Sequence, residues 1–320
     1  MAETADTDAA SAAPDLPSLA GVPRQRLAAA FAQCRHITRT RARNFYYGLR
    51  LTPEPRRSAI FAVYAWMRAA DDAVDDAPPG CAEQALAQFR LASEIAYRGD
   101  ADALASYPLF WTAFAATVAA YSLDRGIFDA VIDGLEEDLG HSGYDNEAEL
   151  DRYCYRVAST AGLACVAIWG LRPGVDSAVA HDLAVRRGRA FQRTNILRDF
   201  CQDYDASPRR IYLPRDAFAR HGLTPDDLRR WRRPDACRAL VAEQAARARA
   251  EYAASAPLEG MIDPPCVPTL WAMTRIYSAL LEVIERDPER IVSMRRIRVP
   301  APRKALIALR AAWRRRRSEW

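Results

Sequence analysis

The sequence predicts an all-α protein with a single folded domain. Alanine, leucine and arginine, which favour helices, dominate most of the chain. Proline and glycine fall mostly between such stretches, and no segment alternates apolar and polar residues as a half-buried strand does. Half of the 320 residues are hydrophobic, which is enough for a large core, and no change of composition within residues 24–317 marks a domain boundary.

Helix-breaking residues place the expected helices along the chain. Pro53 and Pro55 precede the second helix, and Pro78–Gly80 follow it. Gly140 ends the fifth helix, and Pro173 separates two long ones. We expect helices over residues 24–37, 55–76, 82–98, 107–121, 124–139, 147–170, 175–204, 234–254, 267–286 and 302–317.

The two ends of the chain differ from its middle. Residues 1–22 are small and acidic and lack the basic start and apolar block of a secretory signal, so we expect a disordered leader. The folded domain then spans residues 23–305, and residues 306–320 form a basic C-terminal helix or tail. No apolar run reaches the length of about 18 residues that a membrane-spanning helix needs.

Cysteine usage and net charge narrow the environment and the partners. The seven cysteines are an odd number and include no C-x-x-C pair, which fits a reducing cytosol without a disulfide framework or a zinc site. The formal net charge of +4 is too small to indicate nucleic-acid binding. We therefore expect a cytoplasmic protein without a nucleic-acid partner.

The end of the second expected helix is strongly acidic. In FAVYAWMRAADDAVDD (61–76), Asp71 lies one turn from Asp75, and Asp72 one turn from Asp76. Like charges at this spacing cost a few tenths of a kcal/mol per pair, and the negative end of the helix dipole adds to the cost. A bound divalent cation such as Mg²⁺, which prefers oxygen ligands, would reverse both effects. The alternative is a solvated acidic helix end.

A second polar stripe lies in the helix over 175–204. Gln192, Asn195, Asp199 and Asp203 follow i, i+3, i+7 and i+11, so they share one helical face, and Arg198 lies beside it. The alternative is an amphipathic helix with ordinary surface charge. If the two acidic helices face each other in a bundle, they build a cavity with metal-binding walls. Arginines at its mouth suit a diphosphate, whose departure metal and arginine together would promote.

Several segments, in order, resemble the squalene/phytoene synthase family of head-to-head prenyl transferases. The resemblance covers the chain from about residue 30 to about residue 305. The matching segments are CRHITRTRARNFYYGLRLTPEPRRSAIFAVYAWMRAADDAVDD (34–76), YCYRVASTAGL (153–163), FQRTNILRDFCQDYDASPRRIYLPRD (191–216), RIYSALLEVIE (275–285) and RRIRVPAPRK (295–304).

The resemblance implies a fold, a reaction and a cofactor. The fold would be the all-α isoprenoid-synthase helical bundle with a central cavity. Two identical prenyl diphosphates would condense head to head through a cyclopropyl diphosphate, with Mg²⁺, or Mn²⁺ in its place, as the cofactor. We favour farnesyl diphosphate and a presqualene or squalene-type product, because Trp169 would shorten a pocket that it faces; the alternative is a phytoene synthase that uses two geranylgeranyl diphosphates. NADPH would be needed only for reduction to squalene.

The resemblance also assigns roles to individual residues. Metal ligands would be Asp71, Asp75, Asn195, Asp199 and Asp203. The catalytic residues would be Asp71, Asp75, Asp199 and Tyr277. Substrate contacts would come from Arg43, Arg68, Gln192, Arg198 and Arg210, and the small-residue wall beside the prenyl chains from Val157, Ala158 and Gly162.

Three departures from the family pattern bear on these assignments. Asn44 stands where serine or threonine is frequent, Arg193 stands where leucine is usual, and the loop from Asp203 to Arg210 is longer than in many relatives, which bears on the role of Arg210. None of them removes a metal ligand. A non-catalytic family relative that acts as an assembly or scaffold protein would be expected to lose acidic ligands, whereas this chain retains all five. A head-to-tail prenyl transferase or a terpene cyclase is a further alternative, against which the N-I-L-R-D and R-I-Y-L-P segments argue.

The basic C-terminus suggests peripheral contact with an anionic membrane, at the inner membrane surface, by a protein expected to be a monomer. A basic amphipathic helix with an aromatic residue suits the plane of a bilayer surface. The alternative is a helix packed on the domain with a solvated arginine tail. The expected lipid-facing set comprises Leu306, Ile307, Leu309 and Trp313 and the cations Arg295, Arg296, Arg298, Arg303, Lys304, Arg310 and Arg314–Arg317.

Overall fold

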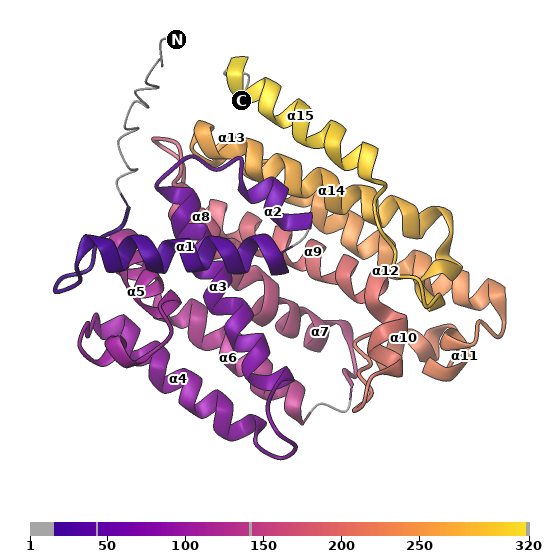
Figure 1. The fold of residues 1–320 in the computed structure, drawn as a ribbon. Coiled ribbons are helices and arrows are strands. Elements are labelled where there is room, and N and C mark those ends of the chain that lie inside the picture. The colour runs from indigo at the N-terminus through magenta and orange to yellow at the C-terminus, as the bar shows by residue number, and fades with distance from the viewer. Residues whose placement is uncertain (1–15, 43, 141–142, 318–320) are drawn as a thin grey trace, which may run out of the picture.

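A computed structural model describes residues 16–42, 44–140 and 143–317 and confirms an all-α fold. Within these ranges no strand forms, and the single extended pairing is a bridge between Leu171 and Ile262. The helices gather into one bundle, with α15 lying along α14 at the edge that is uppermost in Figure 1. None of the described helices combines the length and the apolarity that crossing a bilayer would require.

The helix order follows the chain from the first described turn to Arg317. The α-helices are α1 (Arg24–Arg41), α2 (Asn44–Leu49), α3 (Arg56–Asp75), α4 (Ala82–Arg98), α5 (Phe110–Tyr121), α6 (Arg125–Leu139), α7 (Glu147–Cys154), α8 (Thr160–Trp169), α9 (Ser177–Asp205), α10 (Arg215–Arg220), α11 (Pro225–Arg229), α12 (Pro234–Ala254), α13 (Leu258–Met261), α14 (Val267–Arg286) and α15 (Ala301–Arg317). Short 3₁₀ turns are η1 (Ala103–Ser106), η3 (Pro264–Cys266) and η4 (Pro288–Val292), and η2 (Tyr155–Ser159) is a π-helical turn.

Every expected helix has a counterpart, with boundaries that shift by a few residues. The helix expected over 147–170 is divided into α7, the π-helical turn η2 and α8. Short helices that sequence reasoning did not anticipate are α2, α10, α11 and α13. Residues 1–15 of the expected leader lie outside the described residues. Leu19, which was placed in that leader, packs into the core with only 9% of its surface exposed.

The core consists of two buried clusters. The first surrounds α3, where the fully buried Trp66 stacks on Phe114, contacts Phe89 and the edge of Phe128, and donates its indole N–H to Ser93 Oγ at 3.1 Å. The second surrounds the C-terminal part of α9 together with α12 and α14. Helix α8 contacts both α3 and α9 and so connects the two halves. The acidic ends of α3 and α9 are thereby held on rigid, well-packed helices.

Small residues let α9 approach the central helices closely. A Cβ added to Gly188 would lie 2.4 Å from Ser159 Cα, and one added to Gly162 would lie 3.2 Å from the Ala184 carbonyl oxygen. Ser159 Oγ also donates to the Val185 carbonyl at 2.7 Å. Gly188 therefore admits a backbone-to-backbone contact that any larger residue would push apart. This contact fixes the register of α9 against η2 and α8.

Candidate active site

The acidic end of α3 is partly neutralised by arginines. Asp72 accepts hydrogen bonds from Arg68, one turn earlier, and from Arg41 of α1 at 3.2 Å. Arg68 was expected to contact substrate, yet in this structure its ion pair is with Asp72. The Nε of Arg68 is nevertheless buried without a hydrogen-bond partner. One donor of this guanidinium therefore remains available to an acceptor that enters the site.

Asp71 and Asp75 carry negative charge that the surrounding protein does not fully compensate. Asp71 is exposed, yet desolvation by the surrounding protein raises the pKa of its carboxyl group to about 6. Arg68 opposes this shift, whereas Asp75 and Asp72 add to it. Asp75 has one ion pair, at 3.5 Å, with Arg210. A cation placed beside these carboxylates would relieve their repulsion.

The polar stripe of α9 contains a buried acceptor without a donor. Asn195 donates its amide to Gln192 Oε1 at 3.2 Å, while its own Oδ1 is buried with no hydrogen-bond partner. Burial would raise the pKa of Asp199, but hydrogen bonds from Arg198 and Arg296 outweigh it and hold that pKa below its usual range. Arg296 reaches both carboxylate oxygens, at 2.8 and 2.7 Å. Asp199 is thus held by two arginines.

Arg210 connects the acidic end of α9 to that of α3. Its backbone N–H donates to the Asp203 carbonyl at 2.9 Å, and its guanidinium lies 3.5 Å from Asp75. Burial and, to a smaller extent, the neighbouring Asp199 raise the pKa of Asp203 to about 7 against the opposing effect of Arg210. The structure therefore brings the two predicted acidic motifs to the same end of the bundle, with Arg210 between them.

Tyr277 of α14 completes the wall beside Arg198. Only 4% of its surface is exposed, and its hydroxyl is hydrogen-bonded to Arg198 and Asn195. Burial raises the pKa of this phenol. Its ring packs 4.7 Å from that of Phe191, centroid to centroid. Tyr277 is therefore a neutral, rigidly placed hydroxyl group between α9 and α14.

Asp138, near the end of α6, is an acidic residue that sequence reasoning missed. It accepts hydrogen bonds from the hydroxyls of Tyr153 at 3.0 Å and Tyr212 at 3.5 Å. Burial raises its pKa to about 6, and its charge acts on both Asp71 and Arg210. In the sequence, Asp138 ends the acidic run E-E-D at residues 136–138. The three acids of this run are consecutive and lack the i, i+4 spacing by which the other two acidic clusters were found.

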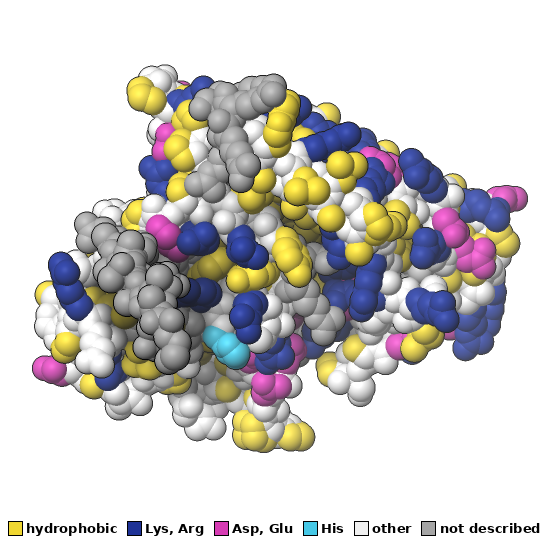
Figure 2. All heavy atoms as spheres, turned by 45° about the horizontal axis from the view of Figure 1, so that its top comes forward, with side chains coloured by type: hydrophobic (Ala, Val, Ile, Leu, Met, Phe, Trp, Pro, Cys, Tyr) yellow, Lys and Arg dark blue, Asp and Glu magenta, His cyan; other side chains and the backbone are white. Residues whose placement is uncertain are grey.

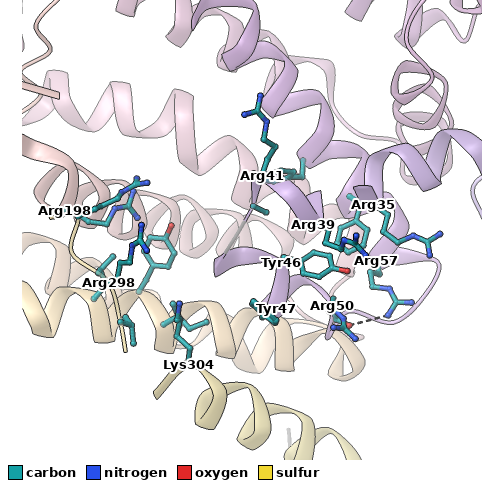
Figure 3. A pocket seen from close by; sticks show the side chains of 18 of the residues that line it. Arg35, Arg39, Arg41, Tyr46, Tyr47, Arg50, Arg57, Arg198, Arg298 and Lys304 are labelled. Atoms are coloured by element: carbon teal, nitrogen blue, oxygen red, sulfur yellow. Dashed lines mark hydrogen bonds between the residues drawn. The ribbon is translucent and has the colours of Figure 1, made fainter. Parts of the chain in front are cut away.

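A strongly basic cavity of about 940 Å³ opens beside these residues, between α1–α3 and α14–α15. Among the described residues that line it, Glu54 is the only acidic one, and it is paired with Arg57 at 2.7 Å. In Figure 3, Arg198 and Arg298 lie on one side of this cavity, and Arg35, Arg39 and Arg57 on the other. The basic lining residues are Arg35, Arg39, Arg41, Arg50, Arg57, Arg198, Arg296, Arg298 and Lys304, and the aliphatic or phenyl ones include Phe61, Ile276, Leu280, Ile297 and Val299.

Some basic residues lie where the sequence did not predict them. Arg296, Arg298 and Lys304 were assigned to a lipid-facing surface, but all three line this cavity, and Arg296 binds Asp199. Arg303 pairs with Glu282 at 2.6 Å. The segment before α15 folds back over the site, which the sequence pattern alone does not reveal. Arg43 lies outside the described residues.

The expected small-residue wall lies deeper in the bundle. Val157 and Ala158 belong to η2 and are partly buried, and a Cβ on Gly134 of α6 would meet Val157 Cγ1 at 3.0 Å. Gly162 packs against Ala184 of α9, as described above for the helix contact. None of these three is among the described residues that line the basic cavity. Trp169 is 2% exposed and belongs to the N-terminal core cluster.

The oxygen donors of the two motifs suit a hard divalent cation. Among the described residues, no three acidic, histidine or cysteine side chains converge closely enough to form a preformed metal site. The unpartnered Asn195 Oδ1 and the raised pKa values of Asp71 and Asp203 mark acceptors and negative charge that lack a counterpart. Carboxylate and amide oxygens are the donors that Mg²⁺ and Mn²⁺ prefer, so the residues fit such an ion.

Known proteins resemble this chain over most of its length. A family model described as squalene/phytoene synthase matches residues 38–303. Phytoene synthase 3 of Zea mays is 35% identical over 307 residues, which are 95% of this chain and 70% of that protein. The 15-cis-phytoene synthase of Synechocystis is 31% identical over 310 residues, which are 93% of this chain and 88% of that protein.

Solved structures share the fold. The squalene synthase HpnC from Alicyclobacillus acidocaldarius matches with a TM-score of 0.73 at 28% identity, over 83% of this chain and 96% of that one. A dehydrosqualene synthase solved in complex with ligand reaches a TM-score of 0.77 at 24% identity, over 90% of this chain and 97% of that one. At that lower identity the likeness is evidence for the fold alone.

Proposed function

The chain belongs to the squalene/phytoene synthase family, and we propose that it is an enzyme that condenses two identical prenyl diphosphates head to head. The observation that carries the proposal is the meeting of two acidic motifs, bridged by Arg210, beside a cavity rich in arginine. Oxygen donors on one side and guanidinium groups on the other suit a metal-bound diphosphate.

We propose geranylgeranyl diphosphate as the substrate and phytoene as the product, in place of the farnesyl series that we favoured from the sequence. The relatives with 31–35% identity over most of the chain are named phytoene synthases. The farnesyl preference rested on Trp169, and this residue is buried in the N-terminal core instead of lining the described cavity. Phytoene forms by loss of diphosphate and protons without a reductant, so we propose that NADPH is not used.

Residues of the proposed site would supply positive charge for the diphosphate and a hydroxyl group of fixed orientation. Arg198 and Arg296 lie beside Asp199. From there, both guanidinium groups would donate hydrogen bonds to diphosphate oxygens. Tyr277 is oriented by Arg198 and Asn195 and offers a hydroxyl at the same wall. The apolar part of the cavity excludes water from reactive carbocations.

The metal assignment is part of this proposal. The residues that would hold Mg²⁺, or Mn²⁺ in its place, are Asp71, Asp75, Asn195, Asp199 and Asp203. Bound Mg²⁺ would neutralise charge on the departing diphosphate and so assist its ionisation. Gln192 would support Asn195 through their hydrogen bond.

We further propose that the enzyme acts as a monomer in the cytoplasm. We place it close to the inner membrane surface because its proposed substrates and product partition into lipid.

Product analysis tests the proposal directly. Purified protein is incubated with Mg²⁺ and, separately, with farnesyl or geranylgeranyl diphosphate, and products are identified by mass spectrometry, with Asp199→Asn as the inactive control. We expect phytoene from geranylgeranyl diphosphate. A squalene-type product from farnesyl diphosphate alone would overturn the proposed prenyl chain length, and no product from either substrate would overturn the enzyme assignment.

Metal removal tests the metal assignment. EDTA should abolish turnover, and Mg²⁺ or Mn²⁺ should restore it. Full activity in the presence of the chelator would refute the metal assignment.

A further inference from the structure

The outward face of α15 is apolar where a surface helix is normally polar. Leu306, Leu309 and Trp313 are 47%, 67% and 50% exposed. They lie at i, i+3 and i+7, so they form one stripe along the helix. The opposite face is also apolar, since Ile307 and Ala311 are buried in the core cluster formed with α14. Packing against the described part of the domain therefore accounts for the buried face of α15, whereas Leu306 and Leu309 on the other face remain about half exposed or more.

Basic residues accompany this stripe, and acidic ones are missing from the helix sequence. Residues 301–317, APRKALIALRAAWRRRR, contain seven arginines and lysines and no aspartate or glutamate. Arg303 is engaged by Glu282, Lys304 faces the cavity, and Arg314 stacks over Trp271 at 5.1 Å. Arg310 lies within the outward stripe itself and is exposed.

We propose that the outward face of α15, formed by Leu306, Leu309, Arg310 and Trp313, docks on the surface of an anionic lipid bilayer. Leucine and tryptophan side chains enter the boundary between headgroups and acyl chains, and arginines remain at the phosphate level. Figure 2 shows hydrophobic and basic side chains interspersed over the face that carries this end of the molecule.

The charge of α15 favours a bilayer over a second copy of the chain as the occupant. A symmetric dimer through this face would bring together two copies of a helix that contains seven basic residues and no acidic residue. Like charges at an interface repel, so the charge of α15 disfavours such a dimer. A bilayer with anionic headgroups supplies the opposite charge and an apolar phase at the same time. The outward face is also a ridge along one helix, which suits insertion between headgroups better than it suits a flat protein surface.

Docking through α15 would hold the basic cavity close to the bilayer. Lys304 in the first turn of α15 and the preceding residues 296–299 line that cavity (Figure 3). Tyr47, which also lines the cavity, is 63% exposed. The advantage that prenyl chains could pass between lipid and cavity without crossing water rests on the proposed function. The evidence for the surface itself does not depend on the reaction.

Vesicle flotation without substrate tests this surface. The full chain is mixed with phosphatidylglycerol-containing or pure phosphatidylcholine vesicles at low and high salt. The test variant is Leu306→Ser/Leu309→Ser/Trp313→Ser, and the matched control is Leu91→Ser, since Leu91 of α4 is 53% exposed but lies on a different part of the bundle. We expect salt-sensitive binding to anionic vesicles, unchanged in the control and reduced at least about tenfold in the triple variant.

Three outcomes would overturn the inference. They are equal binding by the parent and the triple variant, no binding by the parent, and self-association of the parent, measured by light scattering, that the triple variant loses. Thermal unfolding of each variant shows whether the fold is retained, and Arg310→Glu provides a second variant that leaves the apolar stripe intact and should also weaken binding. Product formation in detergent is measured separately, so loss of vesicle binding with normal turnover leaves the proposed function standing.

Discussion

The part of α9 up to Arg193 and the part from Asn195 onward differ in how their buried polar groups are paired. In the first part, the buried side chains of Arg187 and Arg193 have partners for their guanidinium groups. In the second part, Asn195 keeps an unpartnered buried oxygen, and Asp203 has a pKa raised to about 7, chiefly by burial. The two parts belong to one continuous helix, so burial alone does not distinguish structural charges from functional ones. What sets Asn195 and Asp203 apart from Arg187 and Arg193 is incomplete pairing, although Asp199 between them is held by Arg198 and Arg296.

The first part is closed by partners from distant helices. Arg187, 3% exposed, donates to Ser255 Oγ and to the Ser255 carbonyl, both at 2.8 Å, and also to Thr274. Arg193, 5% exposed, lies 2.8 Å from Glu147 and 2.7 Å from Asp151. Arg193 was noted as a departure from the family pattern, and the two acids of α7 compensate for it. The terminal guanidinium nitrogens of Arg187 and Arg193 therefore all have protein partners.

The largest expected effect is on turnover, at the incompletely compensated acids of the proposed metal site on α3. Asp71→Asn should lower turnover by at least about 100-fold, because it removes negative charge from the proposed metal site. Its matched control is Asp76→Asn, an exposed acid of the same cluster, which should change turnover by less than about twofold. Steady-state kinetics measure both variants, and circular dichroism monitors the fold. Near-normal activity of Asp71→Asn would contradict the assignment of this residue.

The next effect is on stability, at the fully paired end. Arg193→Leu removes the buried cation that Glu147 and Asp151 share, although Glu147 keeps Arg247 at 3.2 Å and Asp151 keeps Arg189 at 3.7 Å. We expect the free energy of unfolding to fall by about 1.5–3 kcal/mol. Arg186→Leu, on the same helix but 39% exposed beside Asp182, should cost at most about 1 kcal/mol. Urea unfolding compares the two variants. Equal stability would mean that the Arg193 network does not hold α7 on α9.

This contrast also marks what the sequence could predict. The long helices follow from Pro and Gly positions and from helix-favouring composition, whereas α10 and α11 are too short to show a helical period. The acidic motifs were found because their members are neighbours along one helix. Arg296 was not found, because it reaches Asp199 across 97 residues of sequence. Pairing across that separation depends on how the segment before α15 folds back.

Asp203→Asn should separate stability from activity at the functional end. Burial and Asp199 raise the pKa of Asp203 to about 7, above the value of about 3.9 for an unfolded chain. Its ionised form therefore costs folding free energy above pH 7, and the cost vanishes below about pH 4, where both states are protonated. We expect the metal-free variant to be more stable by about 1–2 kcal/mol near pH 8 and unchanged near pH 4, while turnover falls.

Thermal unfolding at the two pH values measures this difference. The matched control is Asp205→Asn, because Asp205 is two residues away, pairs with Arg229 at 2.7 Å and has a pKa lowered by that arginine. The control should lose a little stability near pH 8 instead of gaining it. A loss of stability in Asp203→Asn of the same size as in the control would show that Asp203 is paired like a structural charge, and the distinction between the two parts of α9 would fail there.

The smallest effect is expected at Arg68, whose guanidinium group is only partly paired. One of its terminal nitrogens is engaged by Asp72, whereas its Nε is buried without a partner. Lysine at this position keeps the charge and can keep the ion pair, but it has no second donor in a fixed plane for a phosphate oxygen. We expect Arg68→Lys to lower kcat/KM about three- to tenfold with unchanged unfolding, and Arg68→Ala to lower it further. If Arg68→Lys matches the parent while Arg68→Ala loses stability, the unpartnered Nε has no ligand to serve, and Arg68 belongs with Arg187 and Arg193 as a structural charge.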